Sequence, residues 1–244
     1  AEYGVRSPSW GLAGSVRVEG DLLLLNAGAS GMALRASDGG VVWSSGGGPG
    51  GYATPVLFDR DGKRVAAIFG SGALNVVEAA TGKVLWTFPW QTPNAVNAAD
   101  PLLVGDRLLI SSNYGKGCAL VELAPSGARA VWQNNALEAH FTSPVTHGGR
   151  IYGISGDARR PQGSLVCLDA ATGRTIWSAP MGIGSVTVAG DRLLVTGSTG
   201  AQSLIVVAAL GTARYQELAR TGALRGMSWT PPVLSDGKIG RAHV

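Results

Sequence analysis

One short motif recurs along this chain and constrains its fold more than any other feature. A turn containing glycine is followed by a tryptophan in SDGGVVW, ATGKVLW, SGARAVW and ATGRTIW, which end at Trp43, Trp86, Trp132 and Trp177. The copies are about 45 residues apart. A repeat of this length indicates an array of equivalent units, because each unit is too small to bury its own apolar surface.

A second motif lies upstream of each turn and keeps the same spacing. It consists of a short apolar strand, a Gly-Asp or Asp-Gly turn and another strand, as in SVRVEGDLLLL from Ser15 and DPLLVGDRLLI from Asp100. Such turns use residues that tolerate a positive φ, and they favour tight β-hairpins. A third strand and the tryptophan-bearing strand complete each unit, with Gly82 and Gly173 in two of the turns between them. The sequence therefore predicts repeated four-stranded antiparallel sheets.

Four-stranded sheets bury both faces when they stack around an axis, and this arrangement is the β-propeller. The sequence predicts an all-β propeller with blades at approximately 14–43, 53–86, 98–132, 142–177 and 183–215, and the start of another at 229–238. In the degenerate fifth copy, LGTARY, Tyr215 is predicted at the tryptophan position. Propellers commonly close with about 4–8 blades. We expect a fragment of a ring of about eight blades, with about five present.

The repeated tryptophans, Trp43, Trp86, Trp132 and Trp177, are predicted to lie at the seams between successive sheets. A large flat ring placed there removes apolar area from water. The indole N–H then needs an acceptor, and the carbonyl groups of nearby turns are the natural candidates.

Composition excludes several classes of protein. The chain is 45% hydrophobic, with 15% charged residues and a net charge of +4 that is scattered rather than collected in a Lys/Arg block, so no nucleic-acid binding is predicted. No apolar run is long enough to span a membrane, and the start AEYGVRSPSW does not have the pattern of a signal peptide. Residues 239–244 resemble a translated sequencing adapter, and we set them aside as a possible non-native tail.

The units VVEAATGKVLW and LVCLDAATGRTIW resemble the tryptophan-docking motif of PQQ-like, quinoprotein-type propeller repeats, with Glu78 and Asp169 at the acidic position. The resemblance covers nearly the whole chain. The group contains uncharacterised bacterial proteins, outer-membrane assembly lipoproteins of the BamB type and quinoprotein alcohol dehydrogenases, and its architecture is similar to that of WD40 and YVTN-like repeats. The resemblance implies a bacterial protein that is periplasmic or secreted.

The resemblance leaves three functions open. We favour a non-catalytic binding or scaffold propeller that recognises a protein or an extended ligand; the alternatives are a PQQ-dependent dehydrogenase and a BamB-like assembly factor. Dehydrogenases of the group hold PQQ between a tryptophan and a disulfide of neighbouring cysteines, beside a calcium ion. Here Cys118 and Cys167 are far apart, and zinc spacings and a nucleophile elbow are missing. We therefore predict no catalytic residue, no metal and no cofactor, with PQQ and calcium as the alternative.

The loops that lead into the first strand of each unit supply a candidate binding site. Aromatic or polar side chains recur just before the proline that starts this strand, and the loop SSNYGKG adds two more. The candidates are Tyr52, Asn97, Asn113, Tyr114, His140, Phe141 and Trp229. In a propeller such loops open on one rim of the central channel, which predicts a funnel for a ligand or protein partner. The alternative is that the rings pack under the loops and the polar groups satisfy the loop backbone.

Overall fold

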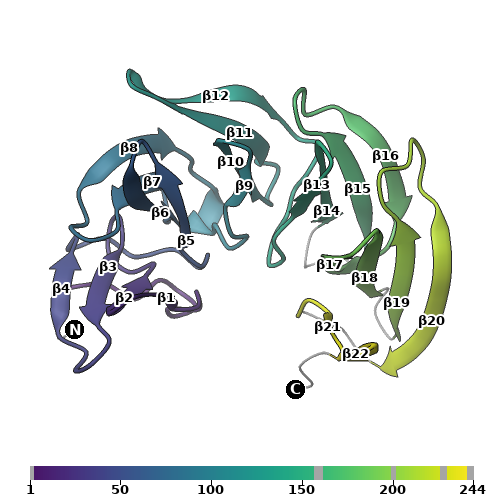
Figure 1. Cartoon of the computed structure of the whole chain (residues 1–244), viewed down its shortest axis with the longest axis horizontal. Helices are drawn as coiled ribbons and strands as arrows, with labels where there is room; N and C mark the ends of the chain where they lie inside the picture. Colours follow the sequence, from purple (N-terminus) through teal and green to yellow (C-terminus); the bar gives the residue numbers. More distant parts are fainter. Residues whose placement is uncertain (1–2, 157–161, 199–201, 226–229, 241–244) are drawn as a thin grey trace. The chain divides into compact units, whose positions relative to one another are not determined.

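Five four-stranded sheets follow one another along the chain, which we name blades 1 to 5 (Figure 1). The structure, a computed structural model, describes residues 3–156, 162–198, 202–225 and 230–240. It divides into two compact units. Unit 1 contains Ala1–Ile110 and Leu120–Val131, and unit 2 contains Ser111–Ala119 and Trp132–Val244. The division passes through blade 3.

Blades 1 and 2 lie in unit 1, and blade 3 begins there. Blade 1 contains β1 (Arg17–Glu19), β2 (Leu22–Leu25), β3 (Met32–Arg35) and β4 (Val41–Ser44). Blade 2 contains β5 (Val56–Arg60), β6 (Lys63–Phe69), β7 (Ala73–Glu78) and β8 (Val84–Pro89), followed by the 3-10 turn η1 (Pro93–Ala95). Blade 3 contains β9 (Leu102–Val104), β10 (Arg107–Ser112), β11 (Gly117–Ala124) and β12 (Gly127–Asn134).

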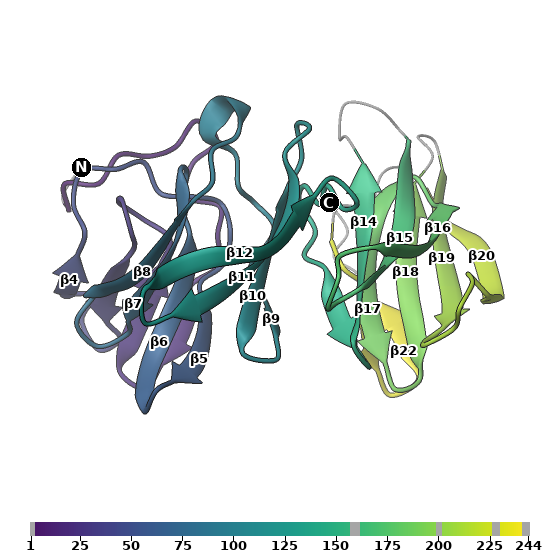
Figure 2. The ribbon, with the colours of Figure 1, turned by 90° about the horizontal axis from the view of Figure 1, so that it is seen from above.

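Blades 4 and 5 lie in unit 2, where their strands run side by side (Figures 1 and 2). Blade 4 contains β13 (Val145–His147), β14 (Arg150–Gly156), β15 (Gly163–Asp169) and β16 (Thr175–Pro180). Blade 5 contains β17 (Ile183–Ala189), β18 (Arg192–Ser198), β19 (Gln202–Ala209) and β20 (Glu217–Arg225). The pair β21 (Val233–Ser235) and β22 (Lys238–Gly240) follows. These sheets confirm the prediction of an all-β propeller built from four-stranded antiparallel blades.

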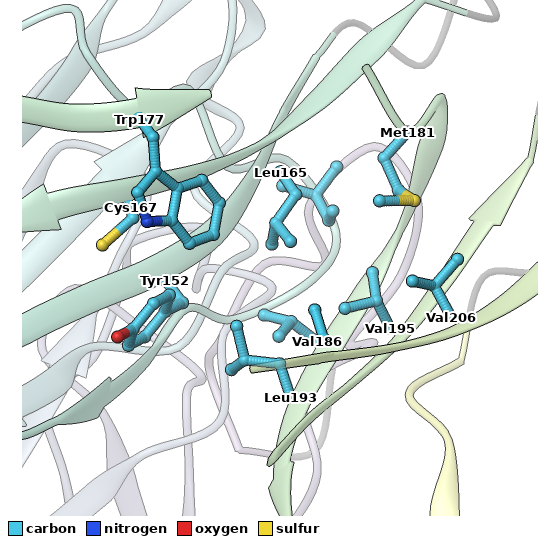
Figure 3. Close-up of a cluster of buried hydrophobic side chains, with 11 residues drawn as sticks. Tyr152, Leu165, Cys167, Trp177, Met181, Val186, Leu193, Val195 and Val206 are labelled. Carbon is cyan, nitrogen blue, oxygen red and sulfur yellow. The ribbon is translucent and has the colours of Figure 1, made fainter. Parts of the chain in front are cut away.

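The hydrophobic core of each unit lies between neighbouring blades. In unit 1, Trp43 and Leu24 of blade 1 pack against Ala66, Ile68 and Val77 of blade 2. In unit 2, Tyr152, Cys167 and Trp177 of blade 4 pack with Leu193 and Val206 of blade 5 (Figure 3). Alternate residues of each strand therefore face a neighbouring sheet, which is what the short apolar runs require. No helix among the described residues is long and apolar enough to cross a bilayer.

Each repeated tryptophan contacts the backbone of the following blade. The indole N–H groups of Trp43, Trp86, Trp132 and Trp177 donate to the carbonyl oxygens of Ala79, Ala124, Ala170 and Thr212, at 2.9, 2.8, 3.0 and 3.0 Å. These acceptors lie in or at the turns between third and fourth strands. A Cβ atom on Gly82 would lie 2.4 Å from the ring of Trp43, and one on Gly173 would lie 2.6 Å from the ring of Trp132. Glycine at these two positions is thus required both by the positive φ and by the indole above it.

The tryptophan position of blade 5 was wrongly predicted. Trp177 pairs with Cys167 in blade 4, and the residue that pairs in the same way with Val207 in blade 5 is Ala219, not Tyr215. Tyr215 lies in a longer turn, and its ring centroid is 5.6 Å from that of Trp177. The sheet also continues to Arg225, beyond the predicted end of the blade at residue 215.

Candidate functional site

The candidate residues lie in two kinds of loop that share one end of a blade. Because strands alternate in direction, the loop before the first strand and the turn between the second and third strands lie at the same end of an antiparallel sheet. The turn before β11 and the loop before β13 are of these two kinds, and the residues that they bring together belong to unit 2.

Three rings form a stack in these loops of unit 2. The Nε2 atom of His140 is hydrogen-bonded to the hydroxyl oxygen of Tyr114 at 3.1 Å, and the two rings meet edge to face with centroids 5.0 Å apart. The ring of Phe141 stacks on that of His140, with ring centroids 3.7 Å apart and an interplanar angle of 21°. Phe141 is the outer member and is 47% exposed. The stack presents the ring of Phe141 to solvent, and exposed aromatic rings are favoured anchors in protein recognition.

The side chain of Asn113 bonds to backbone groups beside this stack. Its side chain is buried, its Oδ1 atom accepts the N–H of Tyr114 at 2.6 Å, and its Nδ2 atom donates to the carbonyl oxygen of Gly156 at 2.5 Å. The first bond fixes Tyr114 in its left-handed conformation, with φ of 67°. The second ties the turn to the end of β14. This geometry favours the structural interpretation of Asn113 over direct contact with a ligand.

Unit 1 carries an aromatic pair at the position of blade 2 that corresponds to Phe141. Tyr52 and Trp10 meet edge to face with ring centroids 5.9 Å apart, and the backbone N–H of Trp10 donates to the hydroxyl oxygen of Tyr52 at 3.4 Å. Trp10 is 65% exposed. The sequence pattern found Tyr52 but missed Trp10, because nothing in the repeat places the first residues of the chain against this loop.

Asn97 is fully buried in unit 1. Its Nδ2 atom donates to the carbonyl oxygens of Gly70 and Trp90 at 2.9 and 3.3 Å, and its own carbonyl accepts the N–H of Tyr52 at 3.2 Å. Asn97 therefore holds the loop of Tyr52 in place. As with Asn113, these contacts favour the interpretation that the side chain bonds to the loop backbone and not to a ligand.

A further asparagine has the same role as Asn113 and was missed by the sequence analysis. Asn26 is buried after β2, as Asn113 is after β10, and its Nδ2 atom donates to the carbonyl oxygens of Ala53 and Phe69, both at 2.9 Å. Its Oδ1 atom accepts the N–H of Gly51 at 2.9 Å. The signal was present in the sequence, since both asparagines follow the apolar run of the second strand.

The members of the predicted funnel belong to both units. Tyr52 and Asn97 belong to unit 1, whereas Asn113, Tyr114, His140 and Phe141 belong to unit 2. Trp229 lies outside the described residues. A single funnel that joins all seven stays a prediction.

The residues described do not fit the quinone and calcium site that the resemblance implies. Cys118 and Cys167 are free and buried, and they are not neighbours in sequence. Burial raises the pKa of the Cys118 thiol to about 11 and also raises the pKa of Cys167, which keeps both thiols protonated near neutral pH. In the described part of the chain, no group of three or more His, Cys, Asp or Glu side chains is placed to hold a metal ion.

Comparisons with known proteins agree with a propeller built from PQQ-like repeats. The family described as outer membrane protein assembly factor BamB matches residues 6–179. BamB from Moraxella catarrhalis superposes with a TM-score of 0.63 at 16% identity, covering 91% of this chain and 64% of that chain. No curated protein sequence matches the chain.

Other propellers superpose as well. A quinohemoprotein alcohol dehydrogenase from Comamonas testosteroni gives a TM-score of 0.59 at 11% identity, covering 91% of this chain and 44% of that chain. The Cps50 (Swd1) β-propeller domain of Myceliophteria thermophila gives 0.54 at 16% identity, covering 90% of this chain and 70% of that chain. This chain thus spans less than two thirds of the BamB chain and less than half of the dehydrogenase chain. At these identities, the likeness to solved structures shows the fold alone.

Proposed function

This chain belongs to the family of the outer membrane protein assembly factor BamB, and from that premise we propose that it is a non-catalytic, protein-binding propeller of the bacterial cell envelope. The observation that carries the proposal is the aromatic stack of Tyr114, His140 and Phe141. It stands on loops that a rigid sheet holds in place, which is where binding residues gather in such scaffolds.

The stack has the properties of an interface anchor. Phe141 offers exposed apolar area, while His140 and Tyr114 hold its ring in one orientation. A ring that is already ordered loses little conformational entropy when a partner covers it. We propose an extended apolar segment of a protein as the partner, which suits a family named for assembling outer-membrane proteins. The proposal includes no PQQ, no calcium and no turnover of substrate.

Site-specific photo-crosslinking in cells tests this function. A photoreactive phenylalanine at position 141 should crosslink to an outer-membrane protein or to a component that assembles one. The same probe at Val131, which is 41% exposed on β12, should not. Phe141→Ala should weaken binding of that partner by about tenfold or more, as for an interface anchor, with an unchanged unfolding temperature.

Two results would overturn the proposal. Equal crosslinking at positions 131 and 141 would remove the stack from the interface. Oxidation of alcohols by the purified protein in the presence of PQQ and calcium would replace the binding role with an enzymatic one.

A further inference from the structure

Trp10 differs from the four outer-strand tryptophans in its exposure and in its indole N–H. Trp10 is 65% exposed, whereas Trp43 and Trp177 are 9% and 8% exposed. Each outer-strand tryptophan donates its indole N–H to a backbone carbonyl, but no residue that the structure describes accepts the indole N–H of Trp10. Packing between blades therefore does not account for this ring.

The segment that carries Trp10 is tied to the loop before β5 on both sides of the ring. Ahead of Trp10, Arg6 pairs with Pro49 in a parallel β-bridge. After Trp10, the N–H of Ser15 donates to the Oγ1 atom of Thr54 at 3.3 Å. The backbone on which the indole stands is therefore held at two points, although the ring itself remains at the surface.

Tyr52 sets the orientation of the exposed indole. Its hydroxyl oxygen accepts the backbone N–H of Trp10 at 3.4 Å, and the two rings meet at an angle of 62° with centroids 5.9 Å apart. Tyr52 is in turn positioned by the buried Asn97, whose carbonyl accepts the N–H of Tyr52 at 3.2 Å. The pair presents two rings at a fixed angle, so little side-chain entropy is lost when a partner covers them.

The two segments that carry this pair contain no charge. Residues 7–15 and 49–55 include no Asp, Glu, Lys, Arg or His. The hydroxyls of Ser7, Tyr52 and Thr54 already bond to backbone groups, so fewer of them remain to bind the hydroxyls of a sugar. The chemistry of the pair therefore suits an uncharged ligand that offers apolar surface to the indole and an acceptor to its N–H.

We propose that the pair of Trp10 and Tyr52 binds a proline-rich protein segment in the polyproline II conformation. A proline ring stacks on the exposed indole, and a backbone carbonyl of the segment accepts the indole N–H. Because a polyproline II helix has no internal hydrogen bonds, its carbonyls are open to such a donor, and aromatic surfaces bind segments of this kind. An α-helix bonds its carbonyls internally and suits the donor less well. The pair lies in unit 1 and shares no residue with the stack of unit 2, so this site does not depend on the function proposed above.

Titration of the full chain with a polyproline peptide tests the site. A peptide of about nine residues spans three turns of a polyproline II helix. Nitrogen-15 NMR follows the indole N–H signals, and the signal of Trp10 is identified by its absence from Trp10→Phe. We expect the Trp10 signal to shift until it saturates, while the signals of the outer-strand tryptophans stay in place. A glycine-serine peptide of the same length should cause no shift.

Matched variants separate the ring from its N–H and binding from folding. Trp10→Ala should weaken binding of the peptide by about tenfold or more, and Trp10→Phe, which keeps a ring without the donor, by about fivefold. Val18→Ala is the control, because Val18 lies on β1 and is 62% exposed, and it should leave the affinity unchanged. Since both positions are exposed, the unfolding temperature should stay the same in all three variants. Fluorescence anisotropy of a labelled peptide measures the affinities.

Four results would overturn the proposal. The peptide would leave the Trp10 signal unshifted, or Trp10→Ala and Val18→Ala would weaken binding equally. A chitin oligosaccharide, and not the peptide, would shift the Trp10 signal, which would make the pair a glycan site. Finally, the chain alone would dimerise in sedimentation experiments and Trp10→Ala would dissociate it, which would make a second copy the occupant of the pair.

Discussion

Two turns of unit 1 share one backbone conformation but lie in different surroundings. The turn of blade 2, at Ala79–Gly82, lies under Trp43, whereas the turn of blade 1, at Ala36–Gly39, faces solvent. Because their hydrogen bonds and φ angles agree, the conformation is set by the local sequence and not by the indole. The tryptophan docks on a turn that is already formed, so its contribution should be separable from that of the turn.

Removal of the indole should have the largest effect, and it measures the contribution of the indole apart from that of the turn. Trp43→Ala should lower the free energy of unfolding by about 3–5 kcal/mol, because the side chain is 9% exposed and leaves a cavity against blade 2. Trp10→Ala is the control, with an expected change below about 0.5 kcal/mol, since Trp10 is 65% exposed. Urea denaturation measures both. Equal losses of unfolding free energy in the two variants would contradict the stabilising contact of Trp43 with blade 2.

A side chain on the turn glycine gives the next largest difference. Gly82→Asn should cost about 1–3 kcal/mol, because its Cβ would lie 2.4 Å from the ring of Trp43. Gly39→Asn carries the strain of a side chain at a positive φ but meets no neighbouring atom, so it should cost less, about 1 kcal/mol. If thermal unfolding shows equal losses for both, the turns themselves differ in a way that their hydrogen bonds do not reveal.

The indole N–H has a smaller effect of its own. Trp43→Phe keeps an aromatic ring at the seam but leaves the carbonyl of Ala79 without its donor at 2.9 Å, which should cost about 1 kcal/mol beyond the change in ring size. A double variant with Gly82→Asn should be less than additive, because both changes act on one contact. If the two losses of unfolding free energy add fully in urea denaturation, the two changes do not act on one contact.

The smallest effect concerns two carboxylates that share these turns. The backbone N–H of Gly40 and the Arg35 guanidinium lower the pKa of Asp38, and Thr81 and Lys63 lower the pKa of Glu78. A lowered pKa in the folded state stabilises the protein above the ordinary value of the group, and this contribution disappears as the pH falls through the folded value. Carbon-13 NMR titration should give a value below 3.8 for Asp38 and below 4.5 for Glu78. A normal value for Asp38 would show that its turn is not formed without a covering indole.

The repeat made most of the fold predictable, and its failures have physical causes. Strand, turn and tryptophan patterns are local, so they indicated the four-stranded blades. Tyr215 was misplaced because counting from the turn assumes a constant turn length, whereas the turn of blade 5 is longer and Trp177 bonds to its Thr212. The sequence indicated aromatic loops at Tyr52 and Phe141, but it could not show that Trp10 lies against Tyr52 or that Tyr114 bonds to His140, because these contacts join distant segments. Burial, which decides that Asn97 and Asn113 bond backbone groups, is a tertiary property.

The acceptors of the four outer-strand indoles are all backbone carbonyls, and even the altered turn of blade 5 supplies one through Thr212. A backbone group is the same whatever residue carries it. An indole therefore finds an acceptor carbonyl in the next blade whichever residue stands at that position. Blades whose side chains differ can therefore make the same contact, which separates the requirements of the seams from those of the loops.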